Sequence, residues 1–519
     1  MDEFSETRAV ERSVVVVSLA TVASRVGGLL RDIVIFALLG LSTWSGLFLF
    51  AFTVPNLFRR LLGEGALTSA MVPLFSEAWE RHSPREAFIF LNRLLSRLSA
   101  VLLGSIGLFS GIFLLGANFL GPHWRRALGL SLLLTPYLLF SCLSAAVSGA
   151  LNVLGSFGLP ALTALFLNVA MVIAGIFALV FCPSDGMLAT AVLCLGVLGG
   201  GAIQFVFPCY LLHRRGWKFR WDWGRNALLL RLWNLFVPAV LGAAMVQINL
   251  TLSRLLAFGL TDTGMATLYL SNRLVELPLG IFAVAILSVT FPGLSRFAAA
   301  GELHSFATGY RRAHWSLLML TVPASIGLLF LGRPILSVLF AWGNYSAADL
   351  ARTVPVLAVA SVGIPFFAAI ALAIRTFHAH QDMGTPLRVA VLGIAANLLL
   401  TLLLVRRLGA AGIAAANVLA AIFQWILLRK KLPKLLGHSP FPCRKFWSLC
   451  AANGFLVLFL ASIAQFFRTP STPRLDSLLH LAVAILPSIC GYAAILRFLD
   501  FGEVGLFFAF LRPFRKRMR

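Results

Sequence analysis

Long apolar stretches recur along the whole chain and alternate with short polar breaks. Each stretch is about 20 residues or longer, which is the length that an α-helix needs to cross a hydrocarbon core of about 30 Å. Breaks at Pro, Gly and charged residues divide the chain into fourteen predicted helices, at 14–39, 46–70, 90–116, 128–152, 159–181, 187–212, 229–257, 265–290, 315–332, 352–378, 385–405, 410–430, 447–466 and 477–498. The pattern predicts an all-α polytopic membrane protein with about fourteen transmembrane helices.

The composition supports this class. Of the 519 residues, 59% are hydrophobic and only 12% are charged, whereas soluble domains carry about 25% charged residues. A soluble globular protein is therefore excluded. The seven cysteines occur singly, outside any metal-ligand spacing, so we interpret them as small packing residues.

The excess of basic residues is a signal of topology. There are 43 Lys and Arg against 19 Asp and Glu, a formal charge of +24. They cluster in interhelical loops and the tail without the aromatic interleaving of RNA-binding modules, so we expect no nucleic-acid partner. An even number of helices puts both termini on one side, and the loops of that side hold most of the basic residues. The positive-inside rule then predicts two cytoplasmic termini.

The basic loop after helix six suggests a division of the chain. We predict an N-lobe at 1–212, a cytoplasmic linker at 213–231, a C-lobe at 232–432, and a last segment, 433–519, with two helices and a basic tail. Pro136 precedes Asn168 by 32 residues, and Pro365 precedes Asn397 by the same 32. This echo favours two related six-helix lobes, an arrangement that places a substrate site where the lobes meet.

Charged residues inside three predicted spans are the main functional signal, because a charge within a membrane costs a few kcal/mol (about 3 kcal/mol on insertion scales) and is usually functional. Helix one carries two arginines and an aspartate, helix two a polar stripe, and helix eight a third group; the residues are Arg25, Arg31, Asp32, Asn56, Arg59, Arg60, Glu64, Arg273 and Glu276. Five cations face three anions. If they converge, the site is net cationic and suits an anion such as phosphate, which guanidinium groups bind bidentately. Purely structural salt bridges, with Asp32 neutralising an arginine, are the alternative.

Motifs for catalysis are absent from the sequence. There is no GxxxxGK[ST], HExxH or GxSxG, and the Gly63-Glu64-Gly65 fragment lacks the rest of a dinucleotide site. We therefore expect no enzymatic activity, no cofactor and no metal site.

Four segments carry a family resemblance. They read SRVGGLLRD at 24–32, PNLFRRLLGEGA at 55–66 followed by Val72-Pro73, SNRLVELPLG at 271–280, and RTFHAHQDMGTP at 375–386. In sequence and spacing, from about residue 12 to 435, they resemble the MurJ/MviN family of bacterial lipid II flippases. The last two helices match that family only in hydropathy.

The resemblance implies a member of the multidrug/oligosaccharidyl-lipid/polysaccharide exporter superfamily with two six-helix lobes around a cationic cavity. Such a protein moves lipid II, the undecaprenyl-diphosphate-linked peptidoglycan precursor, from the inner to the outer leaflet of the bacterial cytoplasmic membrane. Cell-wall synthesis proteins become candidate partners, and Phe455, Phe459 and Phe466 are candidates for a lipid-tail groove. The resulting substrate-binding candidates are Arg25, Arg31, Arg59, Arg60, Arg273 and Asn56, and the supporting or coupling candidates are Asp32, Glu64, Glu276 and Ser24.

Two departures from the family pattern concern acidic residues. Where family members usually have Thr-Asp-Ala-Phe, this chain reads Thr43-Trp44-Ser45-Gly46-Leu47. Some members bind sodium through an acid in helix seven, whereas this helix offers only the neutral residues Gln247, Asn249 and Ser253. We therefore predict no sodium site.

Two other functions stay open at this level. One is an exporter of the same architecture acting on another polyprenyl-linked glycan or on amphipathic drugs, although a drug and cation antiporter would need acids in excess. The other is a non-transporting membrane scaffold that docks partners or anionic lipids through its basic loops. A scaffold gives no reason for arginines in three spans.

Overall fold

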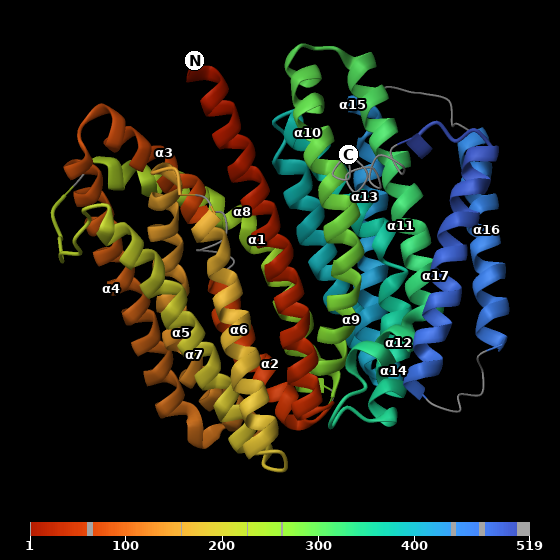
Figure 1. Ribbon diagram of the computed structural model, residues 1–519, viewed down its shortest axis with the longest axis horizontal. Coiled ribbons are helices and arrows are strands. Elements are labelled where there is room, and N and C mark those ends of the chain that lie inside the picture. The colour runs from red at the N-terminus through yellow and green to blue at the C-terminus, as the bar shows by residue number, and fades with distance from the viewer. Residues whose placement is uncertain are drawn as a thin grey trace. The chain divides into compact units, whose positions relative to one another are not determined.

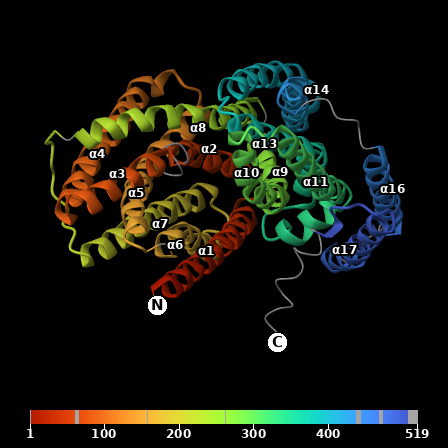
Figure 2. The same ribbon diagram turned by 90° about the horizontal axis from the view of Figure 1, so that it is seen from above.

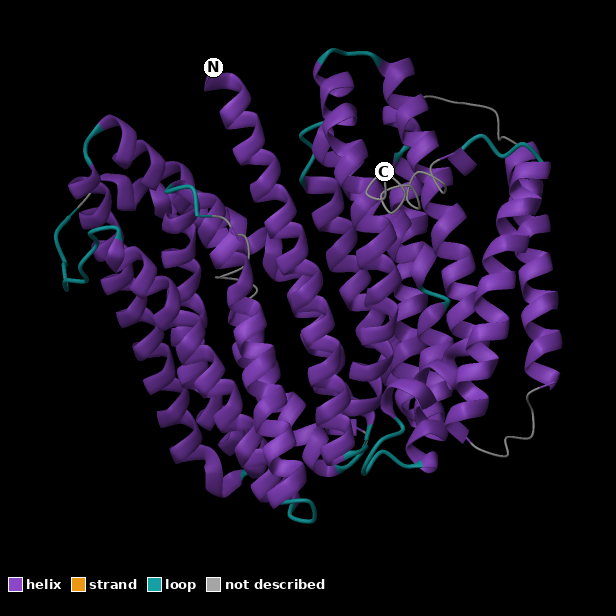
Figure 3. Cartoon of the chain, in the orientation of Figure 1, coloured by secondary structure: helices purple, strands orange, loops and turns teal. Residues whose placement is uncertain are grey.

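The structure is a computed structural model that describes residues 2–59, 66–156, 158–225, 227–260, 263–436, 443–466 and 473–505. Within these ranges the regular structure is entirely helical (Figure 3). The chain forms two compact units, one of Met1–Thr251 with Trp342–Tyr345 and one of Leu252–Ala341 with Ser346–Arg519. The prediction of an all-α protein is confirmed.

Unit 1 is a bundle in which α5 and α6 hold the other helices together. α6 packs against α1 and α7, and α5 packs against α2, α3, α4 and α7; α4, α5 and α7 run side by side (Figures 1 and 2). The helices are α1 (Asp2–Leu39), α2 (Thr43–Phe58), α3 (Ala66–Arg81), α4 (Pro84–Gly116), η2 (Ala117–Phe119), α5 (Pro122–Val153), α6 (Gly158–Phe181), α7 (Gly186–Arg214) and the greater part of α8 (Ala227–Leu260).

Small residues allow α6 to approach its neighbours closely, as is typical of helices that pack within a membrane. A Cβ on Gly200 of α7 would lie 3.0 Å from the Cα of Leu167 on α6. A Cβ on Gly27 of α1 would lie 3.0 Å from Leu165 Cδ1, also on α6. Gly200 therefore sets the separation of α6 and α7, whereas the contact at Gly27 is with the flexible end of a leucine side chain.

The end of α1 is capped by a segment that is distant in sequence. Gly40, at φ 57°, ends the helix, and its N–H donates to the Phe36 carbonyl. The backbone N–H of Asn344 donates to the Ala37 carbonyl at 2.8 Å, and its side-chain Nδ2 donates to the Leu38 carbonyl at 2.6 Å. Residues Trp342–Tyr345 belong to unit 1 because they satisfy these last carbonyls of α1.

Unit 2 is organised around α11, which packs against α10, α12, α13, α16 and α17. Its buried core includes Phe306, Met319 and Leu372, and α16 and α17 lie side by side (Figure 2). The elements after α8 are α9 (Gly264–Pro278), the π-helical turn η3 (Leu279–Ala283), α10 (Val284–Ala299), α11 (Leu303–Phe340), α12 (Ala347–Ser361), α13 (Ile364–Ala379), α14 (Gly384–Lys431), α15 (Pro433–Leu436), α16 (Cys443–Phe466) and α17 (Pro473–Phe498).

Most of the predicted spans coincide with single helices, whereas the predicted helix 352–378 is divided into α12 and α13. In the part of the chain that the structure describes, ten helices are long and apolar enough to cross a membrane, and one of them, α14, contains two predicted spans. α14 is broken at Gly409, whose φ of 55° and ψ of −134° are not helical, and this separates the predicted helices 385–405 and 410–430. The predicted helix 46–70 corresponds to α2 and the start of α3, and the predicted helix 265–290 to α9, η3 and most of α10.

Candidate functional site

Arg31 and Asp32 form a buried ion pair on α1. Arg31 is 9% exposed and Asp32 is fully buried. The guanidinium donates to Asp32 Oδ1 from Nε at 3.0 Å and from Nη2 at 2.6 Å. A buried charge needs such a partner, because each ion loses its hydration when it leaves water. The pairing that the sequence analysis left as a structural alternative is therefore present at these two residues.

Asn168 of α6 connects this ion pair to the preceding turns of α1. Its Oδ1 accepts from Arg31 Nη1 at 3.1 Å, and its Nδ2 donates to the Ser24 carbonyl at 3.1 Å. The contact with Ser24 thus uses the backbone oxygen. The sequence identified Asn168 only through its spacing from Pro136. A lone amide inside an apolar helix is a further signal that could have marked it as a polar contact between helices.

α2 contributes an aromatic ring and a second arginine. The Cζ atom of Arg31 lies 6.0 Å from the ring centroid of Phe52, within the range of a cation–π contact. At the end of α2, Asn56 Oδ1 accepts from Arg59 Nε at 3.1 Å and from Nη2 at 2.9 Å. These two bonds orient the Arg59 guanidinium.

The predicted residues of unit 1 carry net positive charge. Arg25 lies on α1 with an exposed side chain, Arg31 is paired with Asp32, and Arg59 is partly buried. Among the predicted residues in the described part of this unit, three arginines therefore face one carboxylate. Arg60 and Glu64 lie outside the described residues.

Unit 2 contains the third predicted group. Arg273 Nη1 lies 4.0 Å from Glu276 Oε2 on α9, and the two side chains are 25% and 43% exposed. This distance and exposure make the pair much weaker than the one between Arg31 and Asp32. The π-helical turn η3 begins at Leu279, three residues after Glu276. Such turns are often found at functional sites.

Arg254 of α8, which is not among the residues predicted from the sequence, contacts the same helix, α9. Its Cζ atom lies 5.9 Å from the ring centroid of Tyr269, and Tyr269 is one helical turn before Arg273 on α9. An arginine inside the predicted helix 229–257 satisfies the same criterion, a charge within a span, that identified the other arginines.

In each unit, an asparagine side chain donates a hydrogen bond to a serine that lies 144 residues earlier in the chain. Asn168 Nδ2 donates to Ser24 of α1, and Asn397 Nδ2 donates to the hydroxyl of Ser253 on α8 at 3.1 Å. Ser253 in turn donates to Asn417 Oδ1 at 3.0 Å. The two hydrogen bonds therefore have the same spacing along the chain. They involve the two asparagines of the repeated spacing in the sequence, in which Asn168 follows Pro136 and Asn397 follows Pro365.

Helices α16 and α17 form an apolar surface with α11. Phe455 and Phe459 stack at 5.7 Å between centroids, and the side chain of Phe466 lies outside the described residues. A neighbouring cavity of about 340 Å³ is lined by apolar residues, among them Phe282, Leu456 and Leu460, and includes Tyr492. In the described ranges, no cluster of three His, Cys, Asp or Glu side chains could hold a metal ion.

Long apolar helices in two units, with arginines inside the predicted spans, are the architecture of a polytopic membrane protein. The family described as "Lipid II flippase MurJ" matches residues 35–475. A "Probable lipid II flippase MurJ" of Vibrio cholerae is 31% identical over 451 residues, covering 83% of this chain and 84% of that protein. One from Haemophilus influenzae is 30% identical, covering 86% and 89%. The chain belongs to the lipid II flippase MurJ family.

Solved structures agree in fold. A structure described as "Lipid II flippase MurJ, inward closed conformation" superposes with a TM-score of 0.77 at 24% identity, covering 93% of this chain and 99% of that one. An inward-facing multidrug resistance MATE family transporter of the MOP superfamily superposes with a TM-score of 0.64 at 14% identity, covering 82% and 100%. The chain therefore shares its fold with these two proteins. Its long apolar helices and its family make it a multi-pass inner-membrane protein.

Proposed function

We propose that this chain is a lipid II flippase that moves the undecaprenyl-diphosphate-linked precursor from the inner to the outer leaflet. The excess of arginine over carboxylate within the spans carries this proposal. In unit 1, three arginines face one aspartate among the described candidates, and the Arg59 guanidinium is held by a neutral amide. Such a set attracts an anion and repels the cations that an antiporter of cationic drugs would carry.

The chemical task is to carry a charged head group across hydrocarbon. A diphosphate loses its hydration in the membrane, and guanidinium groups replace that hydration with charge-assisted hydrogen bonds while staying ionised. Arg25, Arg59, Arg60 and Arg273 supply these bonds in our proposal, Asn56 orients Arg59, and Glu64 and Glu276 position neighbouring arginines. Arg31, Asp32 and the Ser24 carbonyl form the tie to α6 that holds α1 in place, and Arg31 adds to the positive field.

The movement follows from the two-lobe organisation. The lobes 1–212 and 232–432 rock by alternating access and expose the arginine groups to each side of the membrane in turn. The prenyl tail stays in lipid or along α16 and α17, because each buried CH₂ contributes about 0.8 kcal/mol. Both termini face the cytoplasm, and enzymes that consume lipid II on the outer face are candidate partners.

Arginine substitutions test the assignment. We expect Arg25→Ala, Arg59→Ala and Arg273→Ala each to abolish growth of a bacterium depleted of its own lipid II flippase, because each change removes a diphosphate donor. The Lys variants should not restore growth, since Lys lacks the planar bidentate fork. Lipid II exposed on the outer leaflet is measured directly after depletion, with Arg407→Ala, an exposed arginine of α14, as the matched control.

Expression and membrane insertion are compared for every variant. Normal growth and normal lipid II exposure in all three alanine variants, at matched expression, would refute the proposed site. Export of a different polyprenyl-linked glycan with unchanged lipid II exposure would support the alternative exporter.

A further inference from the structure

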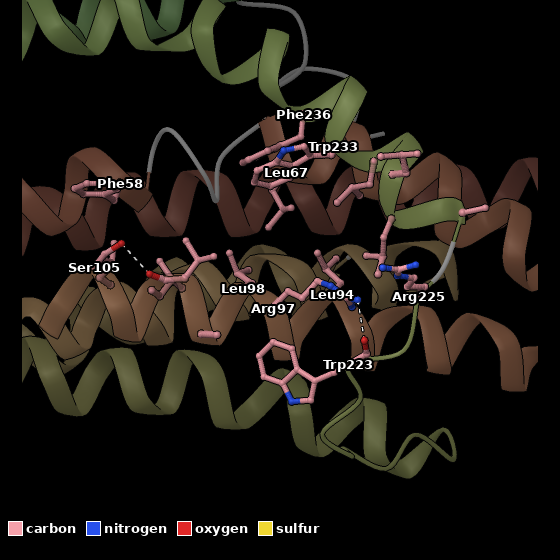
Figure 4. A pocket seen from close by; sticks show the side chains of 18 residues that line it. Phe58, Leu67, Leu94, Arg97, Leu98, Ser105, Trp223, Arg225, Trp233 and Phe236 are labelled. Atoms are coloured by element: carbon pink, nitrogen blue, oxygen red, sulfur yellow. Dashed lines mark hydrogen bonds between the residues drawn. The ribbon is translucent and has the colours of Figure 1, made fainter. Parts of the chain in front are cut away.

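A large apolar groove lies on unit 1. Its volume is about 1060 Å³, and it is lined mainly by α4, the start of α8 and the basic loop before α8, with single residues from α2, α3 and α5. Apolar side chains make up most of its wall, including Leu94, Leu98, Val101, Leu230 and Trp233 (Figure 4). Three of these, Val101, Leu230 and Trp233, are more than half exposed. The groove therefore presents an apolar surface that needs cover from the bilayer.

One end of the groove is cationic. Arg97 and Arg225 lie close to Trp223 at this end, whereas Phe58 and Ser105 lie at the opposite end (Figure 4). Arg97 Nη2 donates to the Gly224 carbonyl at 2.8 Å and to the Trp223 carbonyl at 3.1 Å. These partners are neutral and orient the guanidinium, and the Asp222 carboxylate also lies within electrostatic reach of Arg97.

The nearest acid in this loop already has a cationic partner. Asp222 Oδ2 accepts from Arg93 Nε at 3.0 Å, and the other carboxylate oxygen accepts from the Gly224 N–H at 2.7 Å. Among the described residues that line it, the groove includes two arginines and no Asp or Glu. Net positive charge is thus concentrated at one end of an otherwise apolar surface.

Aromatic side chains place the cationic end at the level of lipid head groups. Trp221 and Trp223 are each 59% exposed and stack with an interplanar angle of 9°. Exposed Trp is typical of the boundary between water and hydrocarbon. The groove therefore runs from this boundary, at Arg97 and Arg225, into the depth at which acyl chains lie.

We propose that this groove binds an anionic phospholipid of the surrounding bilayer. Its phosphate lies against Arg97 and Arg225, and its acyl chains lie along α4 and the start of α8. Among the described residues of the wall, the hydroxyl of Ser105 is the only one, and it donates to the Val101 carbonyl. These described residues include no Asn, Gln, Asp or Glu to bind a sugar or a peptide, so the wall suits a small phosphate head group and not a saccharide-peptide head group.

Lipid titration of the purified full chain tests this site. Delipidated protein in detergent is titrated with phosphatidylglycerol or with phosphatidylcholine of the same acyl chains, and bound lipid is counted by native mass spectrometry. We expect phosphatidylglycerol to bind about tenfold more tightly, because its net negative charge meets two guanidinium groups. The double variant Arg97→Gln/Arg225→Gln should lose this preference, and Arg407→Gln should keep it.

A steric variant is needed as a second test, because Arg97 also donates hydrogen bonds to the loop and its substitution changes the loop as well as the charge. Ala100 lines the groove and is exposed, so Ala100→Phe fills the groove without touching a charge. It should weaken binding of both lipids about tenfold or more. Leu103→Phe is its control, because Leu103 is 50% exposed on the same helix but does not line the groove.

Three outcomes would overturn the proposal. They are equal affinity for the two lipids in the unchanged protein, retention of phosphatidylglycerol by both groove variants, and complete displacement of phosphatidylglycerol by equimolar undecaprenyl diphosphate. The last would assign the groove to the transported lipid. The readout is binding, so it is independent of whether the chain transports lipid II.

Discussion

At the scale of single residues, Arg31 and Asp32 illustrate how one ion pair can serve folding and transport together. The carboxylate is fully buried and accepts two bonds from the guanidinium. Removing one member of a buried pair leaves a desolvated charge, whereas removing both removes the penalty as well. Single and double substitutions therefore separate a structural role from a role in substrate binding.

We expect Arg31→Ala to lower the free energy of unfolding by about 3–5 kcal/mol, because Asp32 then loses this partner. The double variant Arg31→Met/Asp32→Asn should recover most of this loss, since it buries no net charge. Thermal unfolding in detergent measures both effects. If Arg31 also contributes to the positive field of the site, the double variant is folded but fails to support growth. Full growth of the folded double variant would limit Arg31 to a structural role.

The ionised carboxylate of Asp222 helps to hold the loop at 217–225 against α4. The Gly224 N–H and, after it, Arg93 lower the pKa of this carboxyl below its ordinary value. Because the folded pKa is below the unfolded value of about 3.9, the contribution is complete above that value and is lost as pH falls through the folded pKa. Acidification below about pH 4 should therefore weaken the contact of residues 217–225 with α4, which the bonds of Asn92 and Arg97 to this loop still support.

Amide hydrogen exchange over 217–225, corrected for the pH dependence of chemical exchange, measures this weakening. Asp222→Asn should show faster exchange already at pH 7, because it removes the charge that binds Arg93. Asp185→Asn, which changes the first turn of α7 instead, is the control. Equal protection of this loop at pH 7 in Asp222→Asn and the unchanged protein would contradict the expectation.

At the scale of elements, the break in α14 depends on one glycine. Gly409 has φ 55° and ψ −134°, and no atom lies within 4 Å of the position that a Cβ would take. A side chain there is disfavoured by backbone conformation alone. We expect Gly409→Ala to lower the free energy of unfolding by about 1–3 kcal/mol, measured by thermal unfolding.

Gly107→Ala in α4 is the matched control for this substitution. Gly107 also has open space around its Cβ position, but it lies inside a regular helix. Alanine there should stabilise the helix by about 0.5–1 kcal/mol. A similar change in stability for both variants would show that the positive φ at Gly409 is not required.

At the scale of the whole molecule, the question is what drives transport. The predicted helix seven has the neutral residues Gln247, Asn249 and Ser253, and Ser253 is bonded to the neutral side chains of Asn397 and Asn417. Sodium prefers a cage of oxygens that includes a charged one. A loaded complex with net negative charge gains about 2.3 kcal/mol per elementary charge moved through 100 mV.

We therefore expect lipid II exposure on the outer face to stop when an ionophore dissipates the membrane potential and to continue when sodium is removed. The measurement is the leaflet-resolved lipid II assay in cells that depend on this chain. Ionophore treatment with external pH held equal to internal pH is the control for proton gradients. Dependence on sodium with indifference to the potential would refute the idea.

The amino-acid sequence by itself determined the class of protein and the positions of its helices. Length and hydropathy suffice for this, because a bilayer forces each spanning segment to satisfy its own backbone hydrogen bonds as a helix. The charge rule likewise selected Arg31, Asp32 and Arg273 as candidates from their positions alone, and their role in binding stays a prediction. Even the break between 385–405 and 410–430 was predictable, because Gly409 is a residue that tolerates a positive φ.

Only the tertiary structure decided which side chains meet. Arg31 binds Asn168, 137 residues away, and Arg254 lies over Tyr269 on the next helix. The apolar groove of unit 1 is formed by α4 together with a loop more than a hundred residues later in the chain. Arg97 of α4 donates to the Gly224 carbonyl of this loop. Helical periodicity reports the face of one helix and carries no information about which other helix packs against that face. Contacts between distant helices depend on packing of the whole bundle, which local sequence does not encode.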